Sequence, residues 1–112
     1  MKIAIPLADG RLTLHFGHCQ AFALLEVDVQ DKRITKQAVL QPPSHEPGAL
    51  PEWLREQGVE IVIAGGMGER AQQILADAGI RVVVGAEAGE PAALVEAFLN
   101  DTLQAGENIC DH

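Results

Sequence analysis

The two ends of the chain carry the residue types that could hold a metal. Residues 15–19 read His-Phe-Gly-His-Cys, and the last three residues read Cys-Asp-His. These two segments contain both cysteines and three of the four histidines. Thiolates and imidazoles together suit zinc, copper or iron, or a preformed metal–sulfide cluster. The candidate metal ligands are therefore His15, His18, Cys19, Cys110 and His112.

Each segment also has an ordinary structural interpretation. The glycine between His15 and His18 allows a sharp turn that points both to one side, but the spacing is not that of a zinc finger. The two histidines could instead cap a strand or helix end. Cys110 and His112 stand two apart, so both face one way in an extended chain. Residues 105–112 could equally form a frayed polar tail.

A third candidate lies in the middle of the chain. Gly65-Gly66-Met67-Gly68 follows a buried strand pattern and opens a helix pattern. Backbone N–H groups at such a helix N-terminus favour a negatively charged ligand, and Arg70 would add a cationic donor. The pattern is neither G-x-G-x-x-G nor a P-loop, so it predicts neither of those nucleotide sites. The alternative is a tight turn without a ligand, with Met67 as a cap on the core.

Conventional catalysis finds little support in the residue types present. Ser44 is the only serine and stands in no nucleophile motif. Cys19 beside His18 could be an activated thiol, but adjacent residues rarely form a nucleophile–base pair with the right geometry. No pair of carboxylates has a spacing typical of acid–base work. His45, in the proline-rich stretch 41–48, becomes relevant only if that loop folds over the same site.

Composition bounds the class of protein. A chain of 112 residues should form one domain, residues 1–112, and no apolar stretch approaches the ~20 residues of a membrane span. The net charge of −8 and the lack of a Lys/Arg cluster argue against nucleic acid. The first residues are too strand-like for a signal peptide, so we expect a cytoplasmic protein. The cysteines would then be free thiols or share a site, with a disulfide as the third alternative.

The hydrophobic pattern predicts the element order β-β-β-α-β-α-β-α. Residues 21–29 alternate, with one face more buried, and should form a hairpin with residues 34–40 through a tight turn at Asp31-Lys32. Unbroken apolar runs at 60–64 and 81–84 indicate parallel strands covered on both faces. The expected strands are 2–6, 21–29, 34–40, 60–64 and 81–84, the expected helices are 49–57, 68–78 and 91–103, and residues 7–20 and 41–48 stay irregular.

This order predicts a three-layer α/β fold. Right-handed crossovers give a mixed sheet of about five strands with three helices. The first strand should be central, and ligands in such sheets bind at the carboxyl ends of the strands. The loop after the first strand, which carries His15 and His18, would open at that edge.

Four stretches together resemble one family. They are His15-Phe16-Gly17-His18-Cys19 before a strand, residues 45–54 (His-Glu-Pro-Gly-Ala-Leu-Pro-Glu-Trp-Leu), residues 63–68 (Ile-Ala-Gly-Gly-Met-Gly) and residues 106–112 (Gly-Glu-Asn-Ile-Cys-Asp-His). Together they are similar to the dinitrogenase iron–molybdenum cofactor biosynthesis family of small nitrogenase-cofactor carriers and their stand-alone relatives. The resemblance covers nearly the whole chain, and the Ala-Gly-Gly-Met-Gly turn is its most specific part.

The resemblance implies a ribonuclease H-like α/β/α fold and a protein that binds or carries a metal–sulfur cluster. One branch, the orange proteins, holds a molybdenum–copper sulfide cluster without ordinary protein ligation. The implied cluster is of the iron–sulfur, iron–molybdenum or molybdenum–copper type, and the implied partners are cluster donor and acceptor proteins. We expect no nucleic acid or membrane partner, and a monomer or weak dimer.

The main hypothesis is a non-enzymatic carrier of an anionic metal–sulfur cluster, whose charge local donors would offset. The expected cofactor-side contacts are Gly65, Gly66, Met67, Gly68, Arg70 and His45. The alternative is a zinc-binding structural or regulatory protein that uses the Cys and His residues of the two ends. A nuclease of the ribonuclease H type would need acidic residues for Mg²⁺ on the central strands, and the first strand has none.

Overall fold

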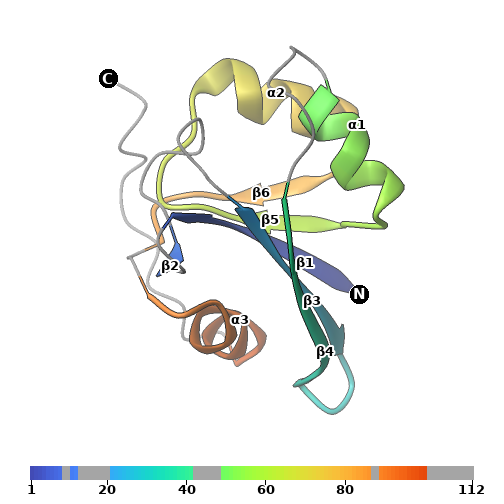
Figure 1. The fold of residues 1–112 in the computed structure, drawn as a ribbon, viewed down its shortest axis with the longest axis vertical. Helices are drawn as coiled ribbons and strands as arrows, with labels where there is room; N and C mark the ends of the chain where they lie inside the picture. Colours follow the sequence, from blue (N-terminus) through green and yellow to red (C-terminus); the bar gives the residue numbers. More distant parts are fainter. Residues whose placement is uncertain (9–10, 13–20, 42–48, 87–88, 101–112) are drawn as a thin grey trace.

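The structure is a computed structural model that describes residues 1–8, 11–12, 21–41, 49–86 and 89–100. The strands are β1 (Lys2–Ala8), β2 (Arg11–Leu12), β3 (Ala21–Asp28), β4 (Arg33–Leu40), β5 (Ile61–Ile63) and β6 (Arg81–Val83); the helices are α1 (Ala49–Glu56), α2 (Glu69–Asp77) and α3 (Pro91–Leu99). The sheet has the order β4-β3-β1-β5-β6, and β2 pairs with β1. Helices α1 and α2 cover one face and α3 covers the other (Figure 1). The expected three-layer α/β fold is confirmed.

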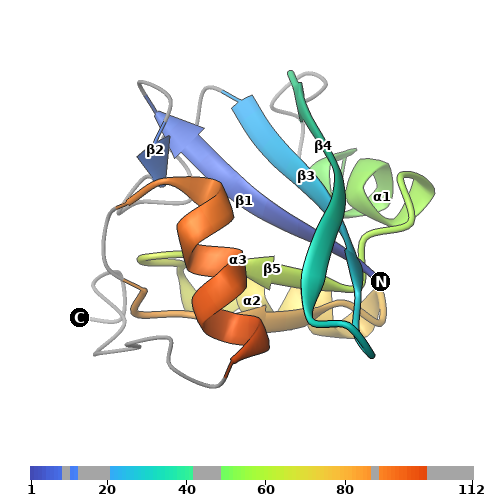
Figure 2. The same ribbon diagram turned by 90° about the horizontal axis from the view of Figure 1, so that it is seen from below.

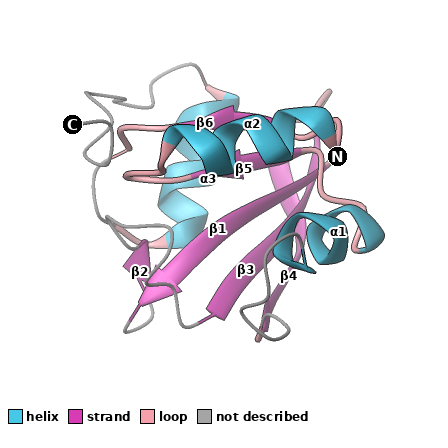
Figure 3. Cartoon of the chain, turned by 90° about the horizontal axis from the view of Figure 1, so that it is seen from above, coloured by secondary structure: helices cyan, strands magenta, loops and turns pink. Residues whose placement is uncertain are grey.

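β1 is the central strand, as expected. It pairs antiparallel with β3 over residues 2–7 and parallel with β5 at Ile3 and Ala4. β5 pairs parallel with β6, and β3 pairs antiparallel with β4. The carboxyl ends of β1, β4, β5 and β6 therefore point to one edge of the sheet, where β3 begins (Figure 3). We call this the carboxyl edge.

The α3 face of the sheet holds one hydrophobic core. Ile5 and Leu25 have no exposed surface and belong to the same cluster as Val95 and Leu99 of α3. Figure 2 shows α3 lying across this face. Leu94 and Phe98 pack against the cluster as well, so the apolar stripe predicted for this helix faces inward.

The opposite face holds the second core, under α1 and α2. Leu54 of α1 and Leu75 of α2 are fully buried there with Phe22 of β3. The rings of Phe22 and Trp53 lie 5.8 Å apart, centroid to centroid, and tilted by 58°. Leu50 packs against the same cluster, which confirms the stripe predicted for the first helix.

Local signals end the helices where the sequence predicts. Gly58 and Gly79 follow α1 and α2 with φ of +83°, a conformation that glycine adopts without strain. Pro91 stands in the first turn of α3. α3 ends at Leu99 with Asn100 as its C-cap, earlier than expected, and residues 101–103 lie outside the described residues. No helix in the described part of the chain is long and apolar enough to cross a membrane.

The expectation that residues 7–20 are irregular is wrong at the start of that range. β1 continues to Ala8, and β2 pairs with it so that Leu12 lies opposite Leu7. The two leucines are 4% and 3% exposed, so burial of both side chains favours this pairing. The Asp-Gly pair between Ala8 and Arg11 is typical of tight hairpins and could have indicated β2.

Two further expectations about burial change. β3 is buried on both faces for most of its length, because Phe22 and Leu24 pack under the helices; the expected difference between faces is limited to Glu26 and Asp28. In β6, Val83 packs against the core under α3 and Val82 against the opposite core, so both faces are covered, but both valines are only half-buried and Arg81 is exposed because β6 is an edge strand. By contrast, Ile61–Ile63 is buried throughout, as predicted.

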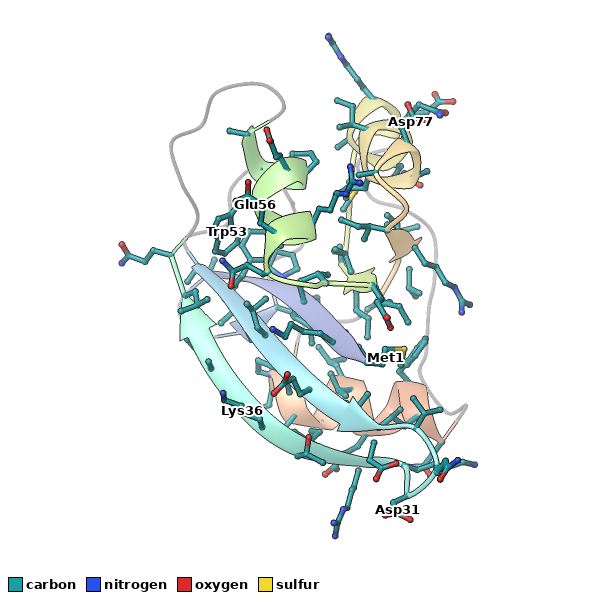
Figure 4. The ribbon with its side chains drawn as sticks, turned by 90° about the vertical axis from the view of Figure 1, so that its right-hand side faces the viewer. Met1, Asp31, Lys36, Trp53, Glu56 and Asp77 are labelled. Carbon is teal, nitrogen blue, oxygen red and sulfur yellow. The ribbon has the colours of Figure 1, made fainter. Side chains whose placement is uncertain are left out.

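Asp28 closes the β3–β4 hairpin, whose turn spans residues 29–32 and is wider than the predicted Asp31-Lys32 turn. Its Oδ1 accepts hydrogen bonds from the N–H of Gln30 at 3.0 Å and of Asp31 at 3.1 Å. The pKa of Asp28 is held below its ordinary value of 3.8, mainly by the hydrogen bond from the Asp31 N–H. The Gln30 N–H and the charge of Arg33 lower it further, and desolvation opposes them with an effect smaller than that of the Asp31 bond. Figure 4 shows Asp31 at the tip of this hairpin.

Truncation of Leu25 in β3 should destabilise the protein far more than truncation of Leu40, which lies opposite Phe22 on the paired strand β4. Leu25 is fully buried, whereas Leu40 is 36% exposed. We expect Leu25→Ala to lower the free energy of unfolding by about 2–5 kcal/mol and Leu40→Ala by less than about 1 kcal/mol. Urea denaturation measures both, and equal losses would contradict the assignment of the core.

Asp28 should make stability depend on pH. Because its folded-state pKa is lowered, its stabilisation is present above the ordinary value of 3.8 and disappears as the pH falls through the folded-state value. The difference in unfolding free energy between the wild type and Asp28→Ala should therefore shrink from about pH 5 to about pH 2. Asp28→Asn, whose amide oxygen accepts without ionising, should keep its advantage over Asp28→Ala at low pH. Urea denaturation at each pH tests this, and a constant difference would refute it.

Candidate functional site

Two glycine-containing connections lie side by side at the carboxyl edge. The β5–α2 turn consists of residues 64–68, and the β6–α3 connection is bonded to it through the N–H of Gly85 and the carbonyl oxygen of Gly65, 2.9 Å apart. The N–H of Leu12 in β2 donates to the carbonyl of Gly89 at 3.1 Å. β2 and both connections therefore form one continuous surface of backbone at this edge.

The carbonyl groups of the β5–α2 turn point into the protein. The carbonyl of Gly65 accepts from Gly85, on the β6 side. The carbonyl of Met67 accepts from the side-chain Nε2 of Gln72 at 2.9 Å, and that of Gly68 accepts from the backbone N–H of Gln72 at 3.1 Å. Because the carbonyl of Ala64 also accepts from the N–H of Ala86 at 3.2 Å, four of the five carbonyls of this turn are held by the second connection or by α2.

The N–H groups that follow these carbonyls point the other way. In a trans peptide the C=O and the next N–H are opposed, and the described residues contain no cis peptide. The N–H of Gly66 therefore faces the β1 side of β5, because β6 lies on the other side. The N–H groups of Gly68 and Glu69 point out of the N-terminal end of α2, where helix geometry leaves them without intrahelical acceptors. Gly66 is buried and Gly68 is half-buried, so the donors that lie at the open end of α2 are the N–H groups of Gly68 and Glu69.

The side chains of the turn add little chemistry of their own. Residues 64–68 contain no titratable group. The Met67 side chain is fully buried in the core under α1 and α2, as in the alternative that made it a cap. Arg70 is exposed in the first turn of α2. This arrangement can bind an anion through backbone N–H groups, and the turn itself offers no nucleophile or general base.

Gly68 is not explained by the protein around it. Its φ of −61° and ψ of 152° suit any residue. A Cβ built at this position would meet no atom within 4 Å. Within the described residues, neither backbone conformation nor packing therefore requires glycine here. A larger side chain would, however, take up the open space in front of the N-terminus of α2.

The remaining candidate residues, His15, His18, Cys19, His45, Cys110 and His112, lie outside the described residues. The residues that flank them are informative. Leu12 and Ala21, on either side of residues 13–20, both pair with Leu7 near the carboxyl end of β1. β4 ends at the same edge shortly before residues 42–48. Both segments therefore leave the described sheet at the edge that carries the glycine turn.

The C-terminal segment leaves from the other side. The guanidinium of Arg81, at the amino end of β6, lies 5.8 Å from the ring centroid of Phe98 near the end of α3. α3 therefore ends toward the edge opposite the glycine turn. Cys110 stands ten positions after Asn100, and a chain of that length spans at most about 35 Å. The meeting of the two chain ends stays a prediction.

No three His, Cys, Asp or Glu side chains among the described residues could hold a metal ion together. Every cysteine and histidine of the chain lies outside that set. The described part of the site is therefore a backbone surface, and any thiolate or imidazole ligation would come from the segments that flank it.

Sequence reasoning missed two contributors to this surface. Gln72 carries no signal, since glutamine is an ordinary residue in a helix. Gly85 could have been found, because a glycine directly after an apolar strand often needs a positive φ, and its φ is +84°. Both hold a carbonyl of the β5–α2 turn.

Solved structures share this architecture across nearly the whole chain. The crystal structure of PH0822 is 29% identical, covers 94% of each chain and has a TM-score of 0.84. The protein mj0327 of Methanocaldococcus jannaschii is 16% identical over 96% of each chain, with a TM-score of 0.74. The apo orange protein of Desulfovibrio gigas is 23% identical, covers 96% of this chain and 93% of its own, and has a TM-score of 0.72. These likenesses place the chain in one class of small three-layer α/β domains.

Within that class the family is defined by sequence. The model of the family described as dinitrogenase iron-molybdenum cofactor matches residues 1–101. The chain belongs to this family, which confirms the expected family; the stretch 106–112 lies outside the matched residues. It is also 27% identical over 85 residues to the protein MJ0580 of Methanocaldococcus jannaschii, over 73% of this chain and 72% of that protein.

Alanine substitutions at Gly68 and Gly79 should show whether the free energy of unfolding depends on the open space around a glycine or on its positive φ. Gly68→Ala should change the free energy of unfolding by less than about 1 kcal/mol, because the φ is ordinary and the space is open. Gly79→Ala should lower it by about 1–2 kcal/mol, because φ is +83° there. Urea denaturation measures both. If Gly68→Ala were as destabilising as Gly79→Ala, the space at Gly68 would not be open.

Proposed function

We propose that the protein binds and carries an anionic metal–sulfur cluster, of the iron–molybdenum or molybdenum–copper type, during cluster assembly or trafficking. One observation carries the proposal. In a chain of the iron–molybdenum cofactor family, the β5–α2 turn directs its carbonyls inward and its N–H groups to the carboxyl edge. Ligands in open α/β sheets bind at that edge.

A backbone surface of this kind suits a bulky anion whose charge is spread over sulfides. Several N–H donors can each take part of the charge, and the N-terminus of α2 adds its dipole. Arg70, exposed in the first turn of α2, supplies a cation beside these donors. Local donors are needed because the chain carries a net charge of −8, which repels an anion at long range.

Thiolates and imidazoles would complete the site from the flanking segments. We propose His15, His18, Cys19 and His45 as ligands or hydrogen-bond donors, because their segments begin at the same edge. Cys110 and His112 would act as a lid if the tail reaches across. The partners of such a carrier are the proteins that donate and accept the cluster, and its cycle includes no turnover of an organic substrate.

The direct test is the content of the protein as the cell makes it. Anaerobic purification from the native host should give a coloured protein with stoichiometric metal and labile sulfide. A colourless, metal-free protein that also failed to take up a cluster in reconstitution would end the carrier proposal. One zinc ion without labile sulfide would support zinc binding instead. Cys19→Ser and Cys110→Ser then separate thiolate ligation from non-covalent holding.

Gly68→Val should weaken cluster retention while the protein stays folded. The added side chain occupies the open space at the carboxyl edge and keeps the ligand from the N–H donors. Loss of one charge-assisted hydrogen bond corresponds to about tenfold weaker binding. Anaerobic titration followed by the visible spectrum measures it. The control Gly79→Ala should lose stability and keep wild-type affinity. If Gly68→Val bound the cluster as tightly as the wild type, the β5–α2 turn would not be part of the site.

A further inference from the structure

Gln72 holds two consecutive carbonyls of the β5–α2 turn at once. Its backbone N–H donates to Gly68 at 3.1 Å, as expected in a first helical turn. Its side-chain Nε2 reaches five residues back and donates to the carbonyl of Met67 at 2.9 Å, in a partly buried position. The second bond is not part of the helix and does not extend α2. Its geometric effect is on the Met67–Gly68 peptide.

The neighbouring Gln73 shows what a helical glutamine does without this role. Its Nε2 donates to the Oδ1 of Asp77 at 3.0 Å in an exposed position. Figure 4 shows Asp77 at the outer surface of α2. Two adjacent glutamines on one helix therefore make one side-chain hydrogen bond each, and only that of Gln72 reaches the glycine turn.

The bond to Met67 decides which way the following N–H points. Rotation of the Met67–Gly68 peptide by half a turn would move the φ of Gly68 from −61° into the region that glycine alone tolerates. Because residue 68 is a glycine, the flipped peptide is sterically allowed. The hydrogen bond from Gln72 to the Met67 carbonyl favours the unflipped orientation. A hydrogen bond of ordinary net strength shifts such a balance about fivefold.

We infer that Gln72 is a positioning residue of the anion site: it fixes the Met67–Gly68 peptide so that the Gly68 N–H points to the carboxyl edge before a ligand arrives. A donor that is already oriented spares the ligand the reorganisation that would otherwise weaken binding. This inference rests on the proposed function. It adds that the donor set of the turn is preorganised by a side chain that does not touch the ligand.

The experiment compares Gln72→Met with Gln73→Met. Methionine has nearly the length of glutamine, suits a helix and lacks the N–H donor. In the ligand-free protein, the ¹⁵N–¹H resonance of Gly68 should shift or broaden by exchange in Gln72→Met and stay unchanged in Gln73→Met. The affinity for tetrathiomolybdate, used as an anionic metal–sulfide probe, should fall by up to about fivefold in Gln72→Met and by less than twofold in Gln73→Met. If Gln72→Met failed to fold, Gln72→Ala would replace it.

The outcomes separate the two proposals. An unchanged Gly68 resonance, or equal affinity of Gln72→Met and the wild type, would overturn the positioning role and leave the carrier function standing. A merely structural role would lower the thermal stability of Gln72→Met and leave the Gly68 resonance in place. A wild-type protein unable to bind tetrathiomolybdate or a reconstituted cluster would overturn the proposed function, and the ligand role of Gln72 with it.

Discussion

The two-sided pairing of β1 is the constraint on which the rest of the structure depends. Met1 and Val27 exchange hydrogen bonds of 2.8 and 3.2 Å, so the odd-numbered residues of β1 bond to β3. The even-numbered residues face β5, as the carbonyl of Lys2 does in accepting from the N–H of Glu60 at 3.0 Å. Because successive side chains of a strand point to opposite faces, Ile3 and Ile5 enter the core under α3 and Ala4 enters the opposite core, so both cores pack against this one central strand.

Pro6 ends the hydrogen-bonded pairing of β1 with β5. Proline is uncommon in a central strand because it has no N–H to donate. Here the missing donor would face β5, and pairing of β1 with β5 is confined to Ile3 and Ala4. Beyond that level β2 takes the place of β5 beside β1, at Leu7 and Ala8. The glycine turn therefore leaves the sheet where the ladder can no longer continue, which opens the carboxyl edge.

Most of the fold follows from the sequence because apolar periodicity and helix-ending glycines are local signals. The strand order follows as well, since right-handed crossovers leave few alternatives. β2 was missed because two residues show no period, and the burial of β6 was overestimated because an edge position cannot be read from an apolar run. The Gly65-Gly66-Met67-Gly68 turn was predicted as an anion site. The direction of its peptides was not, because it depends on Gln72 and Gly85, which meet the turn only in the folded chain.

An acidic protein can hold an anion if the attractive groups outweigh the repulsive ones near it. The repulsive charge nearest these donors in sequence is the carboxylate of Glu69 in the first turn of α2, which the N–H donors and Arg70 must offset. Charges separated by more than about 8–10 Å are largely screened at physiological ionic strength, whereas N–H donors act at about 3 Å. The net charge of −8 therefore limits the approach of an anion more than its retention. Backbone N–H groups do not titrate at physiological pH and contain no thiol that could be oxidised. The binding that they provide is therefore insensitive to pH and redox state. If the proposed cluster is released in response to pH or redox state, the histidines and cysteines are the residue types of this chain suited to supply that response.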